Sequence, residues 1–109
     1  MLARLLGSAN KERVLVFLAA RGKGYSRQIA RFFKVSLYPV QNALDKLEEA
    51  GVLISRTVGS TREYEFSPRY PAREELAALV TRALSLYPQA VRDELLFTRQ
   101  RPRRKGKPL

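Results

Sequence analysis

The chain has 109 residues, with 21 lysine and arginine residues against 10 aspartate and glutamate residues, so its formal net charge is +11. This length fits one domain with a modest core and little room for a deep substrate cavity. Cysteine and histidine are absent, which excludes disulfides, zinc-finger ligation and thiol or imidazole catalysis. The charge is the one extreme value, and it indicates a polyanionic partner such as nucleic acid.

The positive charge is unevenly distributed. Residues 99–109 hold six basic residues and no acidic one, which leaves a net charge of +5 on residues 1–98. Because this segment contains proline and glycine and little apolar surface, we expect a flexible basic tail. It is either a phosphate-binding arm or a solubilising segment, and its cations are Arg99, Arg101, Arg103, Arg104, Lys105 and Lys107.

Two short helices are predicted in the first third of the chain. Apolar residues at helical spacing predict one over residues 10–21, with a cap at Ser8 or Asn10 and a stop at Gly22. The second begins at Ser26, whose hydroxyl we expect to accept a first-turn N–H.

A third helix is predicted after a tight turn at residues 34–36. We expect Ser36 to cap this helix and Gly51 to stop it, and Pro39 is tolerated because first-turn N–H groups have no helical partner. Its inward face is formed by Val40, Ala43, Leu44 and Leu47.

The hydrophobic period then changes from helical to alternating. Residues 52–58 and 61–66 are predicted as strands, and the glycine–serine pair between them can make the tight turn of a β-hairpin. Pro71 is well placed as the first residue of a fourth helix, and a last helix is predicted over residues 89–98. No apolar run approaches the roughly 20 residues of a membrane span.

The predicted order is helix, helix, turn, helix, β-hairpin, helix. A helix–turn–helix followed by a two-stranded wing is the winged-helix arrangement, so we predict an α+β, mostly helical fold. We expect residues 1–98 to form this winged helix–turn–helix domain with C-terminal dimerisation helices, and residues 99–109 to form the tail.

The helix–turn–helix region also carries a residue pattern. It consists of YSRQIA at 25–30, VS at 35–36 and GVL at 51–53, with Val40, Leu44, Leu47 and Glu48 between them. This pattern resembles winged helix–turn–helix repressors of the ArsR and MarR type. The run at 58–64, followed by PRYP at 68–71, is similar to a subgroup of small prokaryotic winged-helix regulators, some of which accompany nucleotidyltransferases.

The resemblance implies a cytoplasmic, dimeric transcriptional regulator that binds double-stranded DNA. The sequence departs from the pattern at Lys34, where such turns often carry glycine, and at Pro39, inside the recognition helix. Metal-sensing members of the ArsR type use cysteine and histidine ligands. Because the chain has neither residue, we expect no such metal site and no cofactor.

The third predicted helix carries the candidate base-reading residues. The major groove admits one helix, where amide side chains pair with adenine and a tyrosine ring can touch a thymine methyl. We therefore predict base contacts by Tyr38, Gln41 and Asn42. Phosphate or wing contacts are predicted for Arg27, Arg31, Lys34, Ser36, Lys46, Ser60, Thr61 and Arg62. The alternative for each residue is ordinary solvated surface, and for Arg62 a pair with a nearby acid.

A long apolar stripe is predicted on the fourth helix, and it consists of Leu76, Leu79, Val80, Ala83, Leu84 and Tyr87. The stripe either covers the core of its own domain or pairs with a second copy. Because it exceeds what a small core edge needs, we expect a homodimer whose half-sites lie about 34 Å apart.

Three other functions stay open. One is a protein-interaction module, such as an antitoxin-like partner of a nucleotidyltransferase, and another is a non-specific architectural nucleic-acid binder. An enzyme has the least support, because the sequence shows no nucleophile–base pair, phosphate loop or metal cluster. We expect no membrane association.

Overall fold

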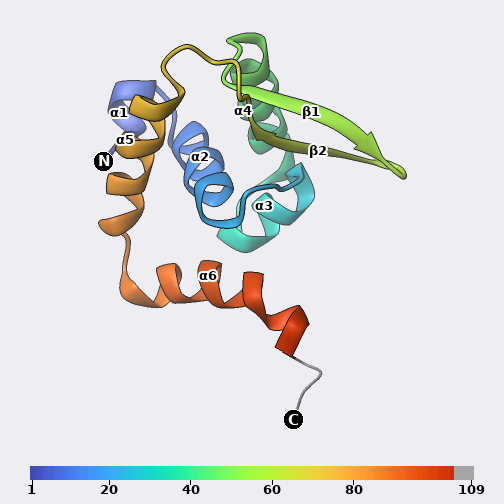
Figure 1. The fold of residues 1–109 in the computed structure, drawn as a ribbon, viewed down its shortest axis with the longest axis vertical. Coiled ribbons are helices and arrows are strands. Elements are labelled where there is room, and N and C mark those ends of the chain that lie inside the picture. Colours follow the sequence, from blue (N-terminus) through green and yellow to red (C-terminus); the bar gives the residue numbers. More distant parts are fainter. Residues whose placement is uncertain (105–109) are drawn as a thin grey trace.

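The computed structural model describes the backbone of residues 1–104 and the side chains of residues 1–96. Within this part the chain forms, in order, α1 (Ala3–Leu6), α2 (Ala9–Arg21), α3 (Ser26–Phe33), α4 (Leu37–Glu49), β1 (Leu53–Val58), β2 (Thr61–Phe66), α5 (Arg73–Ser85) and α6 (Gln89–Arg104) (Figure 1). The α+β, mostly helical fold predicted from the sequence is therefore confirmed. None of the helices in the described part is long and apolar enough to cross a membrane.

Helix α2 lies in the middle of the molecule. In Figure 1, α1 and α5 lie on one side of it, α3 and α4 lie on the other, and α6 crosses below. Residues 14–18 are all buried, so α2 is apolar all round at its centre rather than along one face. The core therefore surrounds α2.

The starts of the helices agree only in part with the predicted caps. Ser8 caps α2 as expected, because its Oγ accepts the N–H of the third helical residue at 3.1 Å. The predicted Ser26 cap is wrong. Tyr25 occupies the cap position of α3, and its N–H donates to Gln28 Oε1 at 3.2 Å. Ser36 occupies the cap position of α4, but its hydroxyl makes no capping hydrogen bond.

The hairpin is a two-stranded antiparallel sheet in which Leu53 lies opposite Phe66 and Val58 lies opposite Thr61. Gly59 opens the turn with φ 64°, a left-handed conformation that glycine adopts without steric cost. Figure 1 shows the hairpin projecting away from the helices. Its tip is thus free to contact a partner.

A backbone pair joins the base of the hairpin to the helices. Gly24 and Tyr64 exchange two hydrogen bonds, of 3.1 Å and 2.8 Å. A Cβ atom at Gly24 would lie 2.8 Å from a ring carbon of Phe17. This close approach of two backbones to an aromatic ring therefore requires a glycine.

Helix α5 begins later than predicted. Residues 67–72 form two successive turns before the helix. In the first, the N–H of Tyr70 donates to the carbonyl of Ser67, and in the second, the N–H of Arg73 donates to the carbonyl of Tyr70. Pro71 consequently lies in a turn before the helix instead of at its first position, so that prediction is wrong.

Helix α6 is longer than predicted, since it ends at Arg104 rather than near Thr98. Arginine and glutamine favour helix, and no proline or glycine interrupts this segment before position 102. Part of the predicted tail, residues 99–104, thus lies on the α6 backbone, and residues 105–109 lie outside the described residues. Arg21 joins α2 to α6, because its Nε donates to the carbonyl of Leu95 at 3.0 Å.

Glu12 is buried, with 6% of its surface exposed, and joins three elements. Its Oε1 accepts the N–H of Leu2 at 2.7 Å and the ammonium of Met1 at 3.3 Å, and its Oε2 accepts the hydroxyl of Tyr87 at 2.7 Å. Burial alone would raise the pKa of Glu12, but these donors outweigh it and the pKa is lowered. The cluster fixes α1 and the end of α5 against α2.

Candidate nucleic-acid interface

The turn between α3 and α4 is set by Lys34. This residue has φ 57° and ψ 47°, the left-handed conformation that glycine adopts most easily. Its N–H donates to the carbonyl of Arg31, and the N–H of Val35 donates to the carbonyl of Ala30. The lysine thus forms the turn that such sequences often build with glycine, and α4 follows directly.

Helix α4 has one buried face and one exposed face. The buried residues are the four predicted ones, Val40, Ala43, Leu44 and Leu47. Pro39 lies in the first turn and does not break the helix. Two of the predicted base-contacting residues are on the exposed face: Tyr38 is 79% exposed and Asn42 is also exposed. Both can meet a ligand without any rearrangement.

Gln41 is the third predicted base-contacting residue, and it is half-buried. Its Nε2 donates to the hydroxyl of Tyr64 at 3.0 Å and to Asp45 Oδ1 at 2.9 Å. Burial raises the pKa of Tyr64, and the hydrogen bond from Gln41 only partly offsets this. The tyrosine hydroxyl consequently stays protonated. The hydrogen bond to Tyr64 also means that the Gln41 side chain points toward the hairpin.

A second polar chain joins α4 to the hairpin. Ser55 Oγ donates to Glu48 Oε2 at 2.6 Å, and Arg62 Nη1 donates to Ser55 Oγ at 2.7 Å. Arg62 therefore folds back along the inner face of the hairpin instead of extending from it. On the outer face, Arg56 and Glu63 form an exposed ion pair at 3.4 Å.

The predicted phosphate-contacting residues lie on the surface. Thr61 is half-buried. The others are exposed, namely Arg27, Arg31, Lys34, Ser36, Lys46, Ser60 and Arg62. Residues 27–34 bring three of these cations together on α3 and the turn that follows it, directly before α4. For the tail, Lys105 and Lys107 lie outside the described residues.

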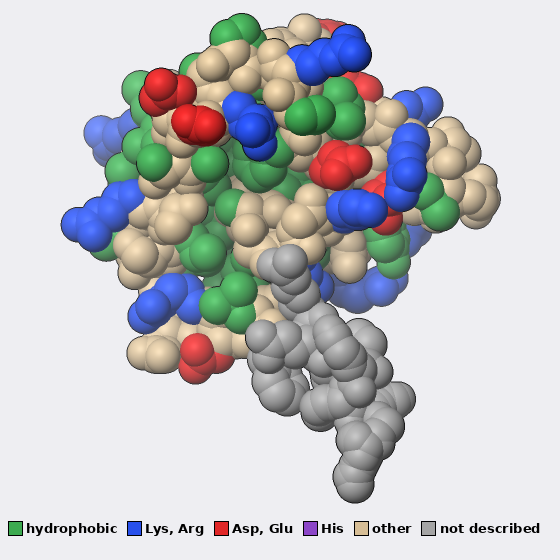
Figure 2. Space-filling view, in the orientation of Figure 1, with side chains coloured by type: hydrophobic (Ala, Val, Ile, Leu, Met, Phe, Trp, Pro, Cys, Tyr) green, Lys and Arg blue, Asp and Glu red, His purple; other side chains and the backbone are tan. Residues whose placement is uncertain are grey.

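Charge is mixed elsewhere on the molecule. Figure 2 shows one face, on which lysine and arginine side chains are interspersed with aspartate and glutamate. No single basic patch covers this face. The mixture agrees with the small net charge of residues 1–98.

The apolar stripe of α5 packs largely on the chain's own core. Val80 and Ala83 have no exposed surface, so neither can contact a second copy directly. The hydroxyl of Tyr87 is bonded to Glu12. The partly buried members are Leu76, Leu79, Leu84 and Tyr87. Two other leucines are more exposed: Leu86, directly after α5, is 58% exposed, and Leu5 on α1 is 71% exposed.

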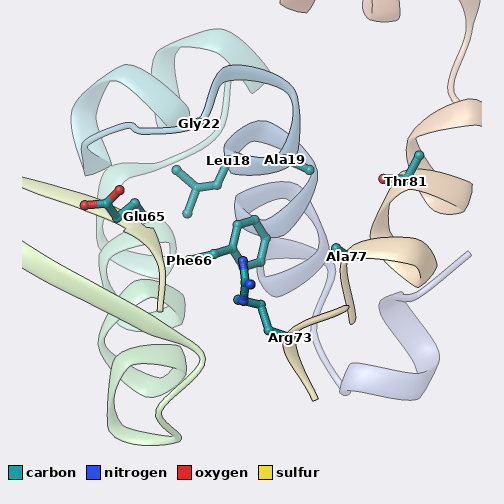
Figure 3. Close-up of a pocket in the computed structure, with 8 residues that line it drawn as sticks. All are labelled: Leu18, Ala19, Gly22, Glu65, Phe66, Arg73, Ala77 and Thr81. Carbon is teal, nitrogen blue, oxygen red and sulfur yellow. The ribbon is translucent and has the colours of Figure 1, made fainter. Parts of the chain in front are cut away.

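A pocket of about 340 Å³ lies where α2, β2 and α5 meet (Figure 3). Its lining is mostly small and apolar, with Glu65 and Arg73 as the charged members. Figure 3 places Glu65 and Thr81 on opposite sides, so the pocket holds no paired hydroxyl and carboxylate. Nor do the described residues contain a group of three acidic residues that could hold a metal ion.

The arrangement as a whole is a winged helix–turn–helix: α3, a tight turn and α4, with a two-stranded hairpin hydrogen-bonded to α4. A scan against protein-family models gives no match, and neither does a search of curated proteins. Solved structures do match.

One is AdcR, the adhesin competence repressor from Streptococcus pyogenes, with a TM-score of 0.57 and 17% identity over 96% of this chain and 76% of that one. A variant of ZitR from Lactococcus lactis has a TM-score of 0.56 and 18% identity, over 92% of this chain and 75% of that one. YusO from Bacillus subtilis has a TM-score of 0.55 and 17% identity, over 91% of this chain and 74% of that one. At these identities the likeness shows a shared fold, and the predicted winged helix is confirmed.

Sequence reasoning missed several residues of this site. Leu37, at the first position of α4, is 38% exposed and was not predicted to face a ligand. Ser55 and Tyr64 link the hairpin to α4. The alternating pattern of the two strands could have indicated this, because it places Ser55 and Tyr64 on the same inward face of the hairpin as Leu53.

Proposed function

We propose that the chain is a sequence-specific, double-stranded DNA-binding transcriptional regulator of the ArsR or MarR type, acting as a cytoplasmic dimer. The observation that carries this proposal is the first half of α4, where Tyr38 and Asn42 are exposed opposite a fully buried face. A helix of about this length fits the major groove, and its N-terminal residues approach base edges. That AdcR, a similar fold, is named a repressor supports the proposal.

The charges around α4 set the direction of approach. Exposed cations at Arg27, Arg31 and Lys34 precede its first turn, where they can contact phosphates. Asp45 and Glu49 are exposed in its second half and repel phosphates. We infer that the N-terminal half of α4 lies in the groove while the C-terminal half tilts away from the duplex.

We assign base contacts first to Tyr38 and Asn42. Gln41 can reach a base only by leaving Tyr64 and Asp45, so its contribution comes second. The hairpin tip, with the exposed Ser60 and the half-buried Thr61, meets the flanking DNA backbone. The basic residues from position 99 onward add further phosphate contacts.

The test is a fluorescence-anisotropy titration of wild type against selected and random duplexes at two salt concentrations. Selected duplexes should bind roughly 10³-fold or more tightly than random ones. Asn42→Ala should weaken binding of the selected duplex by about 1–3 kcal/mol. Gln89→Ala removes an exposed amide on α6, away from α4, and should change nothing.

Two results would redirect the proposal. Equal, salt-dependent binding of all duplexes would mean a non-specific architectural protein. Absence of DNA binding, together with a stoichiometric protein partner, would mean an interaction module.

A further inference from the structure

The first turn of α4 presents a small apolar surface. Leu37 is 38% exposed, Tyr38 is 79% exposed and Pro39 is exposed as well. The core takes its α4 residues from position 40 onward, so these three side chains are not needed to fill it. They lie at the end of the helix that enters the groove under the proposed function.

The other side chains of α4 narrow the chemistry that this turn can recognise. The amide of Gln41 is bonded to Tyr64 and Asp45. Asn42 is therefore the one exposed amide on the helix. Amides of this kind pair with the N6 and N7 atoms of adenine. The thymine opposite an adenine carries the only methyl group among the base edges of the major groove.

From this juxtaposition we infer that Leu37 and Tyr38 bind the C5-methyl groups of thymine, beside an adenine read by Asn42. The inference rests on the proposed function and specifies the DNA that it takes: half-sites with A·T pairs under the first turn of α4. An apolar contact is the one that fits a methyl group, and an exposed leucine offers nothing else to a base edge.

Charge complementarity favours DNA as the occupant of this apolar turn. Exposed cations at Arg27, Arg31 and Lys34 lie on the preceding helix and turn. The major groove has base edges at its floor and anionic phosphates along both sides. The apolar turn can therefore meet the base edges while the cations that precede it meet the phosphates. A protein partner docking on Leu37 and Tyr38 is the competing occupant, and the test below separates the two.

The test uses deoxyuridine, which pairs as thymine does but lacks the methyl group. A duplex selected by wild type is synthesised with thymine and again with deoxyuridine in the half-site, and both are titrated by anisotropy. Wild type should bind the deoxyuridine duplex more weakly, by about 4-fold per contacted methyl. The Leu37→Ala, Tyr38→Ala double variant should bind both duplexes equally.

Tyr25→Ala is the matched control, because it removes a tyrosine that is 36% exposed at the start of α3. It should keep the wild-type ratio between the two duplexes. Thermal unfolding checks that each variant folds.

Equal binding of both duplexes by wild type, or selected half-sites without thymine, would overturn the inference and leave the proposed function intact. Failure to prefer any duplex over random DNA would instead remove the proposed function. A stoichiometric protein that binds wild type and not the double variant, without DNA affinity, would assign the surface to a protein partner and overturn both.

Discussion

Lys34 stores backbone strain at the turn between α3 and α4. A left-handed conformation costs an L residue roughly 1–2 kcal/mol, because its Cβ approaches a carbonyl oxygen. Lys34 adopts this conformation, with φ 57°, while its side chain is exposed. The lysine side chain is thus kept at some cost to stability, which under the proposed function fits a phosphate contact next to α4.

The strain predicts that Lys34→Gly stabilises the fold. Removing the Cβ contact should outweigh the extra entropy of glycine in the unfolded chain, giving a gain of about 0.5–1 kcal/mol. Lys46→Gly is the control, because position 46 is exposed in the last turn of α4, where glycine should cost up to about 1 kcal/mol. Urea unfolding measures both. If Lys34→Gly lowers the urea midpoint of unfolding as Lys46→Gly does, the backbone of Lys34 is not strained.

At the scale of elements, α4 and the hairpin form one unit. Tyr64 is 1% exposed, and its hydroxyl accepts the Gln41 amide at 3.0 Å and donates to Asp45 at 3.4 Å. Ser55 makes the parallel connection to Glu48. The hairpin is therefore held against α4 by two separate connections, which fix where its tip lies relative to that helix.

Tyr64→Phe should keep the ring packing and remove the first connection. We expect a loss of about 1 kcal/mol in the free energy of unfolding and faster hydrogen exchange at the hairpin amides. Under the proposed function, affinity for the selected duplex should also fall. Tyr38→Phe removes a solvent-exposed hydroxyl instead and should leave stability unchanged. Equal stability of both variants would show that the Tyr64 hydroxyl does not hold the hairpin.

The Glu12 cluster predicts a pH dependence of stability. Its lowered pKa means that the cluster contributes stability above the ordinary value of 4.5 and loses it as pH falls through the folded-state pKa. Tyr87→Phe should lose about 1.5–3 kcal/mol at pH 7, the range for a hydrogen bond to a charged group. The loss should shrink progressively as pH falls below 4.5 and through the lowered pKa of Glu12, because the carboxylate takes up a proton there.

Urea unfolding at pH 7 and at a series of lower pH values measures this change. In a Glu12→Gln background no ionisation occurs at position 12, so the cost of Tyr87→Phe should be the same throughout the series. A cost of Tyr87→Phe that is also constant when Glu12 is present would show that the charge of Glu12 does not contribute.

Local signals account for most of what the sequence could predict. Gly51 stops α4, and the glycine–serine pair turns the hairpin, because each acts within a few residues. Contacts between distant residues had no such signal. Gln41 turns inward because of Tyr64, 23 positions away, and Tyr87 serves the core because of Glu12, 75 positions away. The orientation of Gln41, a predicted base-contacting residue, and of Tyr87, a member of the predicted dimer stripe, therefore depends on long-range partners that local patterns do not reveal.

For the whole molecule, the basic residues from position 99 onward predict a salt dependence. Each phosphate contact contributes about −0.9 to the slope of log affinity against log salt concentration. Deleting residues 99–109 should reduce the magnitude of this slope and leave sequence preference unchanged. A full-length variant with alanine at the six basic positions checks that lost charge, not lost helix, is responsible. An unchanged slope in both variants would show that this segment does not contact phosphates.

The oligomeric state depends on apolar surface that the fold leaves uncovered. Met1, Leu2 and Tyr87 all contact Glu12, so α1 and the end of α5 lie side by side. Leu5 and Leu86 are the most exposed leucines of this region, at 71% and 58%. A two-fold interface here would leave α4 of each copy free for its own half-site.

We therefore predict that wild type sediments as a dimer and that Leu86→Glu shifts it toward monomer, because a buried unpaired carboxylate opposes association. Val58→Glu is the matched control, since Val58 is 48% exposed at the tip of the hairpin, which projects away from the helices. It should remain dimeric. A dimer that tolerates Leu86→Glu but not Val58→Glu would place the interface on the hairpin, and with it the spacing of the two α4 helices would change.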